Sequence, residues 1–536
     1  MNVNLYHLNG KWIMVDCGSG FADSSLPGVD MVVADLSFIE QRKDDLLGLV
    51  LTHAHEDHIG AIQYLWNNLG CDIYATKFTR NFLELKLSEY SFLSDINMIE
   101  IGESNRFDLG PFNIEMIGLT HSAPEMKALM IRTDKGNIFH TGDWKFDSEP
   151  IVGDKSEKDK IIKCGEEGVM ALVCDSTNVF NEGFSGSEIT VKENLINIVK
   201  ECNSLVVVTT FASNLARLVS IIEAASQSDR KIILTGRSLH RMTEAAKNSG
   251  YLHDIPDIID ETEFKNYDRS KILIISTGCQ GEEMAATTKM ANDIHRHVSL
   301  KAGDHVIFSS KIIPGNEKSI FKVFNILSKK KVNVITENDH QVHVSGHPSK
   351  GELKEMYEMI KPQIVVPVHG EPLHIKEHAK FARSLGIKFS LEPENGVVVD
   401  LNQDKPKIIE TVANGYYAVD GNYLLPENSP IFKMRGRMRD NGIVIATIVL
   451  NKKFSIIGDP VISYPGLLDL REDKDTIVDI KSRVKESVYN RKDNNSSISK
   501  KDVLDKIESK IRNTIRKTIK EEINKYPPII VNITLV

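Results

Sequence analysis

Short apolar runs that end in polar or glycine-rich loops recur through the first 180 residues of the chain. Residues 11–18 (KWIMVDCG) and 46–55 (LLGLVLTHAH) are two of these runs, and buried strands whose carboxyl ends lead into a site have this pattern. Residues 57–70 instead space apolar side chains at helical intervals, with Gly70 as the stop. The alternation predicts a sheet-rich, mixed α/β layer structure. Further strands are predicted at 112–121, 128–144 and 168–177.

A different pattern begins near residue 186 and continues to residue 345. Strand-like apolar runs alternate there with helical patterns such as 214–227 (NLARLVSIIEAASQ). Regular alternation of strand and helix is typical of βαβ units with a parallel sheet, so this segment predicts a second α/β domain. Its strand-like runs lie at 205–211, 231–236, 271–277, 305–310 and 332–337.

The remaining chain returns to a strand, a loop and a helix at 363–386 and then ends in a helix and a strand. The last helix opens on Ser499-x-x-Asp502, which resembles a capping box. It carries an isoleucine at every fourth residue from Ile507 to Ile523. Such a stripe usually packs against the sheet of its own domain, although the basic outer face of the helix could instead contact nucleic acid.

Length and composition place the chain among multi-domain globular proteins. It has 536 residues, of which 41% are hydrophobic and 26% charged, so two to four domains with buried cores are expected. No apolar run reaches the ~18 residues that a membrane span requires, and the opening MNVNLYHLNGKW contains neither a signal core nor a presequence. The six cysteines form no CxxC pair, which argues against a disulfide framework and a cysteine-based zinc site. We therefore expect a cytoplasmic protein that does not contact a membrane.

Net charge neither supports nor excludes a nucleic-acid substrate. The formal charge of −8 does not point to a polyanion binder. An acidic body can still bind nucleic acid through a local basic groove or through bound metal cations.

The segment that carries chemistry is HAHEDH, residues 53–58. Three imidazoles and a carboxylate directly after an apolar strand form a metal-ligand pattern. In an extended stretch His53 and His55 point to the same side, and the following turn can direct Asp57 and His58 to a second ion. Neutral imidazole and carboxylate are ligands that zinc prefers, so the segment predicts zinc rather than an ordinary polar loop.

Three further residues can complete such a site, because each lies where a predicted strand meets a loop. They are His121, Asp143 and His369. Two zinc ions about 3.5–4 Å apart need roughly six or seven protein ligands. Taken singly, each of the three is more often structural, and His140 and His374 are alternatives nearby. Taken with the first cluster, the three are the expected additional ligands.

These motifs together carry a resemblance. HAHEDH with His121, Asp143 and His369 resembles the dinuclear zinc site of the metallo-β-lactamase fold. The inserted α/β domain, CDST and HVSGH are similar to the β-CASP nucleases, and TFASN, TGDWKFD and PVHGEP resemble bacterial ribonuclease J in particular. The implied fold is a metallo-β-lactamase αββα sandwich with an inserted, parallel-sheet β-CASP domain and a small α+β C-terminal domain. The expected parts are the lactamase-like domain at 1–185 and 346–425, the β-CASP domain at 186–345, a linker at 426–449 and the C-terminal domain at 450–536.

By resemblance, two zinc ions bind each subunit and Asp143 bridges them. Asp16 would orient the loops that carry the ligands, from a position behind them. It is equally well explained as a turn residue at the end of a strand. Asp57 would also count among the catalytic residues. The implied ligands are His53, His55 and His121 for one ion, and Asp57, His58 and His369 for the other.

HVSGH is implied to bind the scissile phosphate. The glycine in this motif would let the backbone approach the phosphate closely. His347 would act as general acid, unless it is a buried structural histidine. Asp175 matches the first β-CASP motif and would count among the catalytic residues, unless it is a helix cap. The motif comprises His343, Val344, Ser345, Gly346 and His347.

Two weaker site assignments follow from the same resemblance. Ser213 and Asn214 would bind the same phosphate, or they would cap the helix that begins there. Gly28 and Asp30 match a structural calcium site of some relatives.

The resemblance implies metal-assisted hydrolysis of single-stranded RNA to products with 5′ phosphates, as 5′-to-3′ exonuclease and endonuclease, in RNA maturation and decay. It also implies a homodimer or homotetramer supported by the C-terminal domain. A thioester or lactam hydrolase would need neither the inserted domain nor HVSGH. A DNA nuclease of the same superfamily is an alternative, and so is a non-catalytic RNA-binding scaffold, although a scaffold predicts lost ligands and all seven candidates are present.

Overall fold

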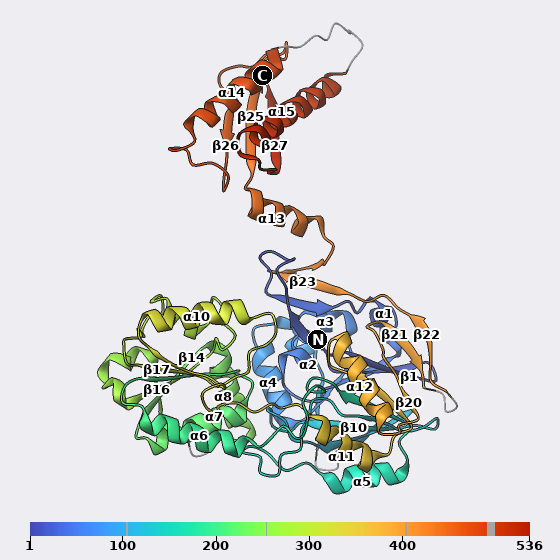
Figure 1. The fold of residues 1–536 in the computed structure, drawn as a ribbon. Helices are drawn as coiled ribbons and strands as arrows, with labels where there is room; N and C mark the ends of the chain where they lie inside the picture. The colour runs from blue at the N-terminus through green and yellow to red at the C-terminus, as the bar shows by residue number, and fades with distance from the viewer. Residues whose placement is uncertain (103–104, 253–254, 402–404, 490–498) are drawn as a thin grey trace. The chain divides into compact units, whose positions relative to one another are not determined.

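The computed structural model describes residues 1–536 except 103–104, 253–254, 402–404 and 490–498. The described chain forms two compact units (Figure 1). One contains residues 1–20 and 33–415, and the other contains residues 21–32 and 416–536. A short segment near the amino terminus therefore belongs to the carboxyl-terminal unit, which the sequence did not predict.

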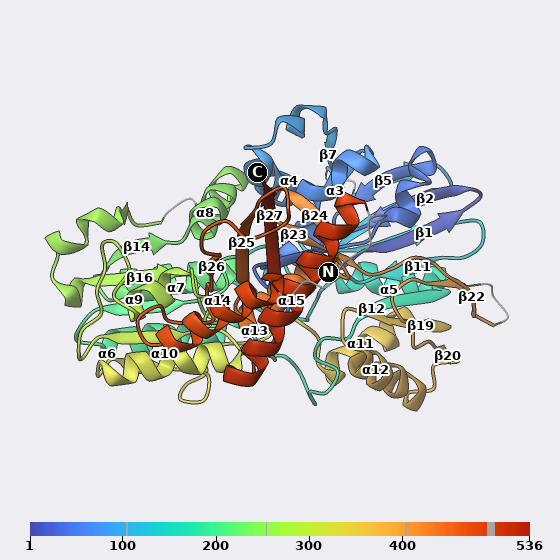
Figure 2. The ribbon, with the colours of Figure 1, turned by 90° about the horizontal axis from the view of Figure 1, so that it is seen from above.

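Two β-sheets pack face to face in the first unit (Figure 2). Buried side chains of both sheets, such as Ile13 and Val50 of one and Leu129 and Val173 of the other, form the core between them. The five-stranded sheet has the order β1 (Asn4–Leu8), β2 (Lys11–Val15), β5 (Leu46–Val50), β6 (Ile73–Ala75) and β7 (Met98–Glu100). The seven-stranded sheet has the order β20 (Phe389–Ser390), β19 (Ile364–Val368), β12 (Ala171–Asp175), β11 (Ile138–His140), β10 (Lys127–Arg132), β9 (Phe112–Gly118) and β8 (Arg106–Leu109).

Helices complete a layered sandwich around these sheets. On the seven-stranded sheet, Leu353 and Met356 of α11 (Lys350–Ile360) pack against Met130 and Phe139. Helix α3 (Ile62–Leu69) buries the residues that the sequence spaces at helical intervals, and it ends at Gly70, whose φ of 62° is left-handed. The αββα prediction is therefore confirmed. The other helices of this part are α1 (Ser37–Glu40), α2 (Glu56–Ile59), α4 (Lys77–Leu87), α5 (Lys158–Glu167) and α12 (Pro372–Ser384), beside a small hairpin of β21 (Val397–Asp400) and β22 (Lys407–Thr411).

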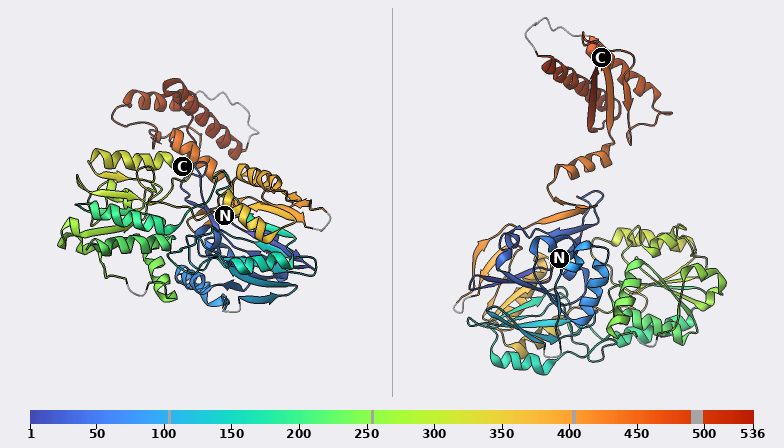
Figure 3. Two further views of the ribbon diagram at one scale, coloured as in Figure 1. Left: turned by 60° about the horizontal axis from the view of Figure 1, so that its bottom comes forward. Right: turned by 180° about the vertical axis from the view of Figure 1, so that it is seen from behind.

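The inserted domain of the first unit is a six-stranded sheet in which every pairing is parallel (Figure 3). All five strands that the sequence predicts in this part are present, which confirms the second α/β domain. The sheet order is β15 (Ile258–Ile259), β14 (Lys231–Thr235), β16 (Ile272–Ser276), β13 (Val206–Thr209), β17 (His305–Phe308) and β18 (Asn333–Ile335). The helices are α6 (Glu188–Glu201), α7 (Leu215–Gln227), α8 (Arg237–Ser249), α9 (Ala286–Ala291) and α10 (Glu317–Lys329).

A buried ion pair holds the chain where it leaves the inserted domain. The guanidinium of Arg217, which is fully buried, pairs with Glu188 at the start of α6. The same guanidinium donates to the carbonyls of Ser309 and Val342 at 2.9 Å each. Because Val342 immediately precedes HVSGH, the inserted domain fixes the entry of that motif into the site.

The second unit contains a three-stranded sheet covered by two helices. Strand β25 (Val444–Leu450) pairs with β26 (Val461–Ser463) and, in parallel, with β27 (Ile529–Leu535). Helix α15 (Lys500–Ile523) begins at Ser499, whose hydroxyl accepts from the Asp502 amide, and the isoleucine stripe is buried in the core with α14 (Lys474–Tyr489). The stripe therefore packs within its own domain.

The segment expected as a linker, residues 426–449, contains regular structure. Helix α13 (Pro430–Asn441) and nearly all of β25 lie in it. Before it, β23 (Tyr416–Asp420) and β24 (Tyr423–Pro426) form a hairpin. Leu26 and Val29 pack with Ala418 and Phe432, which explains why residues 21–32 belong to this unit. The remaining strands of the chain are β3 (Ser19–Phe21) and β4 (Met31–Ala34).

None of the helices in the described part of the chain has the length and the apolar character that crossing a bilayer requires.

Candidate metal centre

The predicted ligands converge where strands of both sheets of the sandwich end. Strand β5 leads into the HAHEDH segment, and β9, β11 and β19 lead into the loops that carry the other ligands. His55 is extended, with φ −78° and ψ 150°, and α2 begins at the next residue. The chain therefore turns between His55 and Asp57, which separates the two halves of the motif. Gly18 lies against this turn, since a Cβ on it would lie 1.6 Å from the Asp57 carbonyl oxygen.

The proposed ligands form two groups that share one carboxylate, and a third group of Asp143, Asp175, His347 and His369 overlaps the second. In each group the potential ligand atoms lie within 4.8 Å of one another, and Asp143 belongs to both. This is the division that the resemblance implied. The first group is His53, His55, His121 and Asp143, and the second is Asp57, His58, Asp143 and His369.

Asp143 is buried between the two groups. Its Oδ2 atom lies 3.8 Å from Nε2 of His53 and of His121, and 3.2 Å from Nε2 of His58. Its Oδ1 atom lies 3.4 Å from Nε2 of His369. One carboxylate thus faces imidazole nitrogens of both groups, which is the geometry of a bridging ligand.

Hydrogen bonds behind the ligands fix the tautomers of two histidines. Nδ1 of His121 lies 2.7 Å from the Gly346 carbonyl oxygen, and Nδ1 of His58 lies 2.7 Å from Oδ2 of Asp16. Both partners are acceptors at these atoms, so each Nδ1 carries the proton. In the neutral ring that coordinates a metal, the lone pair of each Nε2 therefore faces the centre, and Asp16 lies behind His58.

Threonine hydroxyls orient two more of the histidines, His53 and His369, in the same way. Thr52 donates to Asp16 at 2.8 Å and lies 3.0 Å from Nδ1 of His53. Thr177 donates to Asp175 at 2.7 Å and lies 2.6 Å from Nδ1 of His369. Because each hydroxyl proton is already donated to a carboxylate, Nδ1 is the donor in both histidines. Their Nε2 lone pairs also face the centre.

The donor set fits a pair of divalent metal ions. Nε2 of His53 and Oδ1 of Asp143 are buried without a hydrogen-bond partner, a costly arrangement for polar atoms unless something else occupies their lone pairs. Imidazole nitrogen and carboxylate oxygen, with no thiolate, suit zinc and neighbouring divalent metals. The fold and the cluster together support the use of divalent metal.

The titration of these groups indicates a strongly negative centre. Burial alone would lower the pKa of His58, but the nearby carboxylates, Asp143 above all, raise it to about 10. Burial and Asp143 act on His369 in the same opposing ways, and its pKa is also raised well above the ordinary value. The negative charge that favours a proton on these rings equally favours a cation. Burial, followed by His58, holds the pKa of His53 well below its usual range, so its ring is neutral and free to coordinate.

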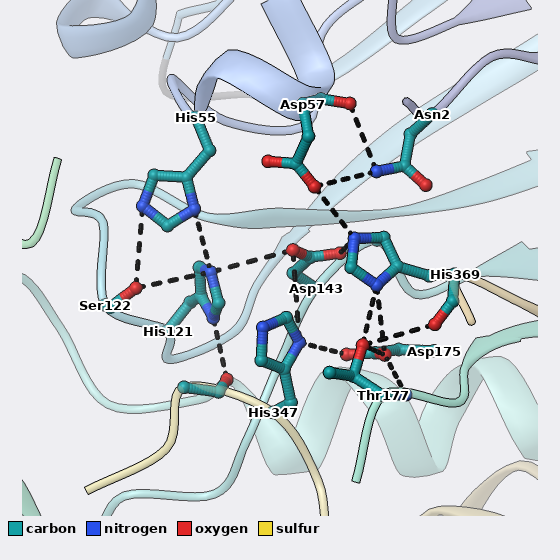
Figure 4. Close-up of polar contacts among 12 residues, drawn as sticks. Asn2, His55, Asp57, His121, Ser122, Asp143, Asp175, Thr177, His347 and His369 are labelled. Carbon is teal, nitrogen blue, oxygen red and sulfur yellow. Dashed lines mark hydrogen bonds and ion pairs between the residues drawn. The ribbon is translucent and has the colours of Figure 1, made fainter. Parts of the chain in front are cut away.

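His347 lies beside this cluster and is paired with Asp175. Its Nδ1 atom lies 2.7 Å from Oδ2 of Asp175, and its ring is 5.1 Å from that of His121 and 5.3 Å from that of His369 (Figure 4). Burial acts to lower the pKa of His347, but Asp175 and then Asp143 act in the other direction, and the net shift is upward. Asp175 is therefore the partner of His347. It also accepts from the Thr177 amide at 2.8 Å, which is a local turn and not a helix cap.

The rest of HVSGH is used to support other side chains. A Cβ on Gly346 would lie 2.8 Å from the His121 ring, so this glycine is required for close packing against a ligand. The Ser345 hydroxyl accepts from Asn178 at 2.6 Å and from the His347 amide at 3.2 Å. The His347 N–H is therefore not free for an anion, and phosphate binding by this backbone stays a prediction.

The first two residues of the motif are largely buried. Burial, followed by Arg217, lowers the pKa of His343 to about 3, and Nδ1 of His343 has no hydrogen-bond partner. Val344 is 7% exposed. Their contact with a phosphate also stays a prediction.

Other candidate residues are placed differently. The Asn214 side chain accepts from the Arg217 amide and caps α7, so the capping interpretation holds for Asn214 rather than for Ser213. Gly28 and Asp30 are exposed in the other unit, and among the described residues no group of potential ligands includes Asp30. The calcium site stays a prediction.

Neither histidine that the sequence offered as an alternative belongs to the cluster. Nδ1 of His140 lies 2.8 Å from the Tyr6 hydroxyl, and burial lowers its pKa to about 4. His374 packs edge-on against Phe180 at 5.2 Å. In the described part of the chain, no potential metal-binding group includes either of them.

Sequence reasoning missed several residues that support the ligands. Thr52 directly precedes His53, and Thr177 is the last residue of the CDST motif. Their positions in the sequence could therefore have marked them as supporting residues. Asn2 and Asn178 lie far from their partners along the chain, and no local pattern marks them. Asn178 holds Ser345 and the His347 carbonyl, and Asn2 contacts the second group of ligands.

Four family models match the chain and together cover most of it. Residues 2–160 match the metallo-beta-lactamase superfamily, and residues 203–327 match the beta-CASP domain of ribonuclease J. Residues 331–391 match the RNA specificity domain of Zn-dependent metallo-hydrolases, and residues 430–536 match the C-terminal domain of ribonuclease J.

Curated relatives are similar over nearly the whole length. Ribonuclease J of Sinorhizobium meliloti is 39% identical over 483 residues, which is 89% of this chain and 86% of that protein. Ribonuclease J of Helicobacter pylori is 36% identical over 97% of this chain and 75% of its own length. Ribonuclease J of Mycobacterium tuberculosis is 36% identical over 84% of this chain and 81% of its own length.

A solved structure supports the fold alone. A protein of unknown function from Enterococcus faecalis superposes with a TM-score of 0.50 at 17% identity. The match covers 76% of this chain and 96% of that one.

Proposed function

The chain belongs to the ribonuclease J family and is a metal-dependent ribonuclease; we propose that its metal is a pair of zinc ions and its substrate single-stranded RNA. The observation that carries the proposal is the buried Asp143 carboxylate between two groups of imidazole and carboxylate ligands. The proposed ligands are those of the two groups, with Asp143 common to both. Two bound divalent cations would stabilise charge on the phosphoryl oxygens and lower the pKa of water to near neutrality.

The protein side chains position and exchange the protons of the proposed reaction. Asp175 holds His347 through Nδ1, which orients the ring and stabilises its charged form. Asp175 raises the pKa of His347, which favours the protonated ring that a general acid requires. Water adds to phosphorus and loses one proton to solvent, the bond from phosphorus to the 3′ oxygen breaks, and His347 gives its proton to that oxygen and regains one from solvent. The products carry a 5′ phosphate and a 3′ hydroxyl.

We further propose that cleavage occurs both from a 5′-monophosphate end in the 5′-to-3′ direction and internally, in RNA maturation and decay. All six cysteines are buried and unpaired, which fits the reducing cytoplasm. A homodimer or homotetramer supported by the C-terminal domain is the proposed assembly.

Two alternatives make different use of the same residues. A non-catalytic scaffold has no need of oriented ligands, whereas four histidines here present Nε2 to one centre. A DNA nuclease of the same superfamily would use the same ligands, so only the substrate separates it from the proposal.

A cleavage assay tests this function directly. We expect a 5′-labelled, 5′-monophosphorylated, unpaired RNA to be cut, the DNA of matched sequence to be cut far more slowly, and a chelator to stop the reaction. Faster cutting of the DNA would assign the chain to the alternative nuclease class. Cutting that persists after removal of metal would contradict the metal assignment.

A further inference from the structure

The side chain of Asn2 lies against two proposed ligands of the second metal ion. Asn2 is 9% exposed, and its Nδ2 atom lies 3.1 Å from Oδ2 of Asp57 (Figure 4). The same atom lies 2.9 Å from Nε2 of His58. We propose that Asn2 is a positioning residue that holds the Asp57 carboxylate in place for the second ion. This inference rests on the proposed metal site.

The partners of the Asn2 amide determine which way it faces. Nδ2 also lies 3.1 Å from the Asp57 carbonyl oxygen. A carbonyl and a carboxylate only accept hydrogen bonds, so the NH₂ group must face Asp57 and the amide oxygen must face away. Nε2 of His58 also lies 2.9 Å from this nitrogen, but it is itself a proposed donor to the ion and cannot accept from Asn2 once an ion binds. The hydrogen bonds that remain are the two to Asp57.

The backbone of Asn2 is fixed from both sides. Its amide donates to the Asp57 carbonyl at 2.8 Å, and its carbonyl accepts from Gly18 at 3.0 Å. The Cys17 amide donates to the His58 carbonyl at 2.7 Å. Asn2 thus joins the loop after β2 to helix α2. Because its backbone is fixed, its side chain is held at a constant position beside Asp57.

Asp57 needs such support because packing does not restrain it. Its side chain is 39% exposed, and the partner of its carboxylate on the other side is Nε2 of His369 at 3.0 Å. That nitrogen belongs to a proposed ligand of the same ion, so it cannot fix Asp57 once an ion binds. Asn2 can, since it approaches from the protein side.

An amide suits this position better than a charged donor. Lysine or arginine would pair with Asp57 and cancel the negative charge that attracts a cation. Asparagine orients the carboxylate and leaves its charge in place. Partners behind metal ligands typically change metal affinity by about 10–100-fold when they are removed, and an effect of this size is expected for Asn2.

Zinc titration of the full chain tests the proposal without relying on activity. Wild type, Asn2→Ala and Asn2→Leu are stripped with a chelator and titrated with zinc alone against a competing chromophoric chelator. Leucine keeps the approximate volume of asparagine but donates no hydrogen bond, so it separates the lost donor from a cavity. Asn4→Ala is the matched control, because it removes the same side chain two residues further along, at the first position of β1.

The expected result is selective. Both Asn2 variants should bind one zinc as wild type does and the other about 10–100-fold more weakly, with unchanged thermal unfolding of the stripped protein. On single-stranded RNA, excess zinc should restore kcat while KM for RNA stays constant. Equal binding of both zincs in wild type and variants would overturn the proposal, and so would equal weakening of both together with lower thermal stability.

Failure of the proposed function would look different. If wild type binds two zincs but cuts no RNA, the ribonuclease assignment fails, whereas the titration still decides the role of Asn2. If wild type cuts RNA and the Asn2 variants titrate normally, only the role of Asn2 fails.

Discussion

The Nδ1 atom of His347 lies 2.7 Å from Oδ2 of Asp175, although the two residues are 172 positions apart in the sequence. Asp175 ends β12 of the sandwich, and His347 follows the inserted domain. The other oxygen of the same carboxylate accepts from Thr177, which orients His369. A single buried carboxylate thus supports both the proposed acid and a proposed metal ligand.

Replacing the proposed acid should slow turnover far more than it weakens RNA binding. For His347→Ala we expect kcat to fall by about 10²–10⁴-fold, the usual contribution of a general acid. Asp175→Asn should lower kcat as well, since it removes the charge that raises the pKa of His347. Single-turnover cleavage and a filter-binding measurement separate the two effects. His340→Ala, at an exposed position, should match wild type, and an unchanged kcat in His347→Ala would remove the acid role.

Gly346→Ala should damage the metal centre although it replaces none of the proposed ligands. The new Cβ would lie 2.8 Å from Cε1 and Nδ1 of His121, so the ring must move or the backbone must shift. We expect weaker zinc binding and slower RNA cleavage. Gly436→Ala is the control, because no atom lies within 4 Å of the added Cβ there. Zinc affinity equal to that of wild type in Gly346→Ala would show that His121 tolerates displacement.

Tyr251→Phe should destabilise the first unit. The Tyr251 hydroxyl donates to Glu125 at 2.9 Å, and Glu125 accepts from the Phe78 amide at 2.8 Å. Glu125 lies in the loop that carries His121, so this bond ties the inserted domain to that loop. Loss of one partner of a half-buried carboxylate should lower the free energy of unfolding by about 1–3 kcal/mol. Urea unfolding measures this change in the free energy of unfolding. Tyr423→Phe is the control, because the Tyr423 side chain is exposed. An unchanged midpoint would mean that the bond contributes nothing.

Acid should destabilise the protein in part through His378. This ring is fully buried between Ser176 and Tyr357, and burial lowers its pKa to about 4. In the unfolded chain its pKa is about 6.5, so the unfolded state binds a proton first as the pH falls. The contribution of His378 to the free energy of unfolding is therefore fully present above pH 6.5. It decreases as the pH falls towards 4, by up to about 1.4 kcal/mol per pH unit.

The variant His378→Gln isolates this contribution. Glutamine does not titrate, so the free energy of unfolding should depend less steeply on pH between about 4 and 6.5 than in wild type. His340→Gln, at an exposed site, should leave the slope unchanged. Parallel curves for wild type and His378→Gln would contradict the lowered pKa.

The sequence predicted the elements and the ligands because both are marked locally. Periodicity marks strands such as β5 and helices such as α3, and HAHEDH places four ligand-type residues at one strand end. His121, Asp143 and His369 were identified by the same rule, since each follows an apolar run. The capping signal at Ser499 was likewise local and correct.

The features that the sequence did not reveal depend on contacts between distant residues. Gly346 is needed because His121, 225 positions away, packs against it, and Asn2 contacts Asp57 across 55 positions. The pairing of residues 21–32 with the second unit depends on packing against Phe432. No local periodicity encodes such contacts.

Zinc content of the purified chain tests the central claim most directly, with Asp143→Ala beside wild type. Because Asp143 faces both groups of ligands, we predict two zinc ions per wild-type chain and loss of at least one in the variant, together with loss of RNA cleavage. Two tightly bound zinc ions in Asp143→Ala, or a wild-type chain that holds none and cuts RNA in excess chelator, would contradict the account.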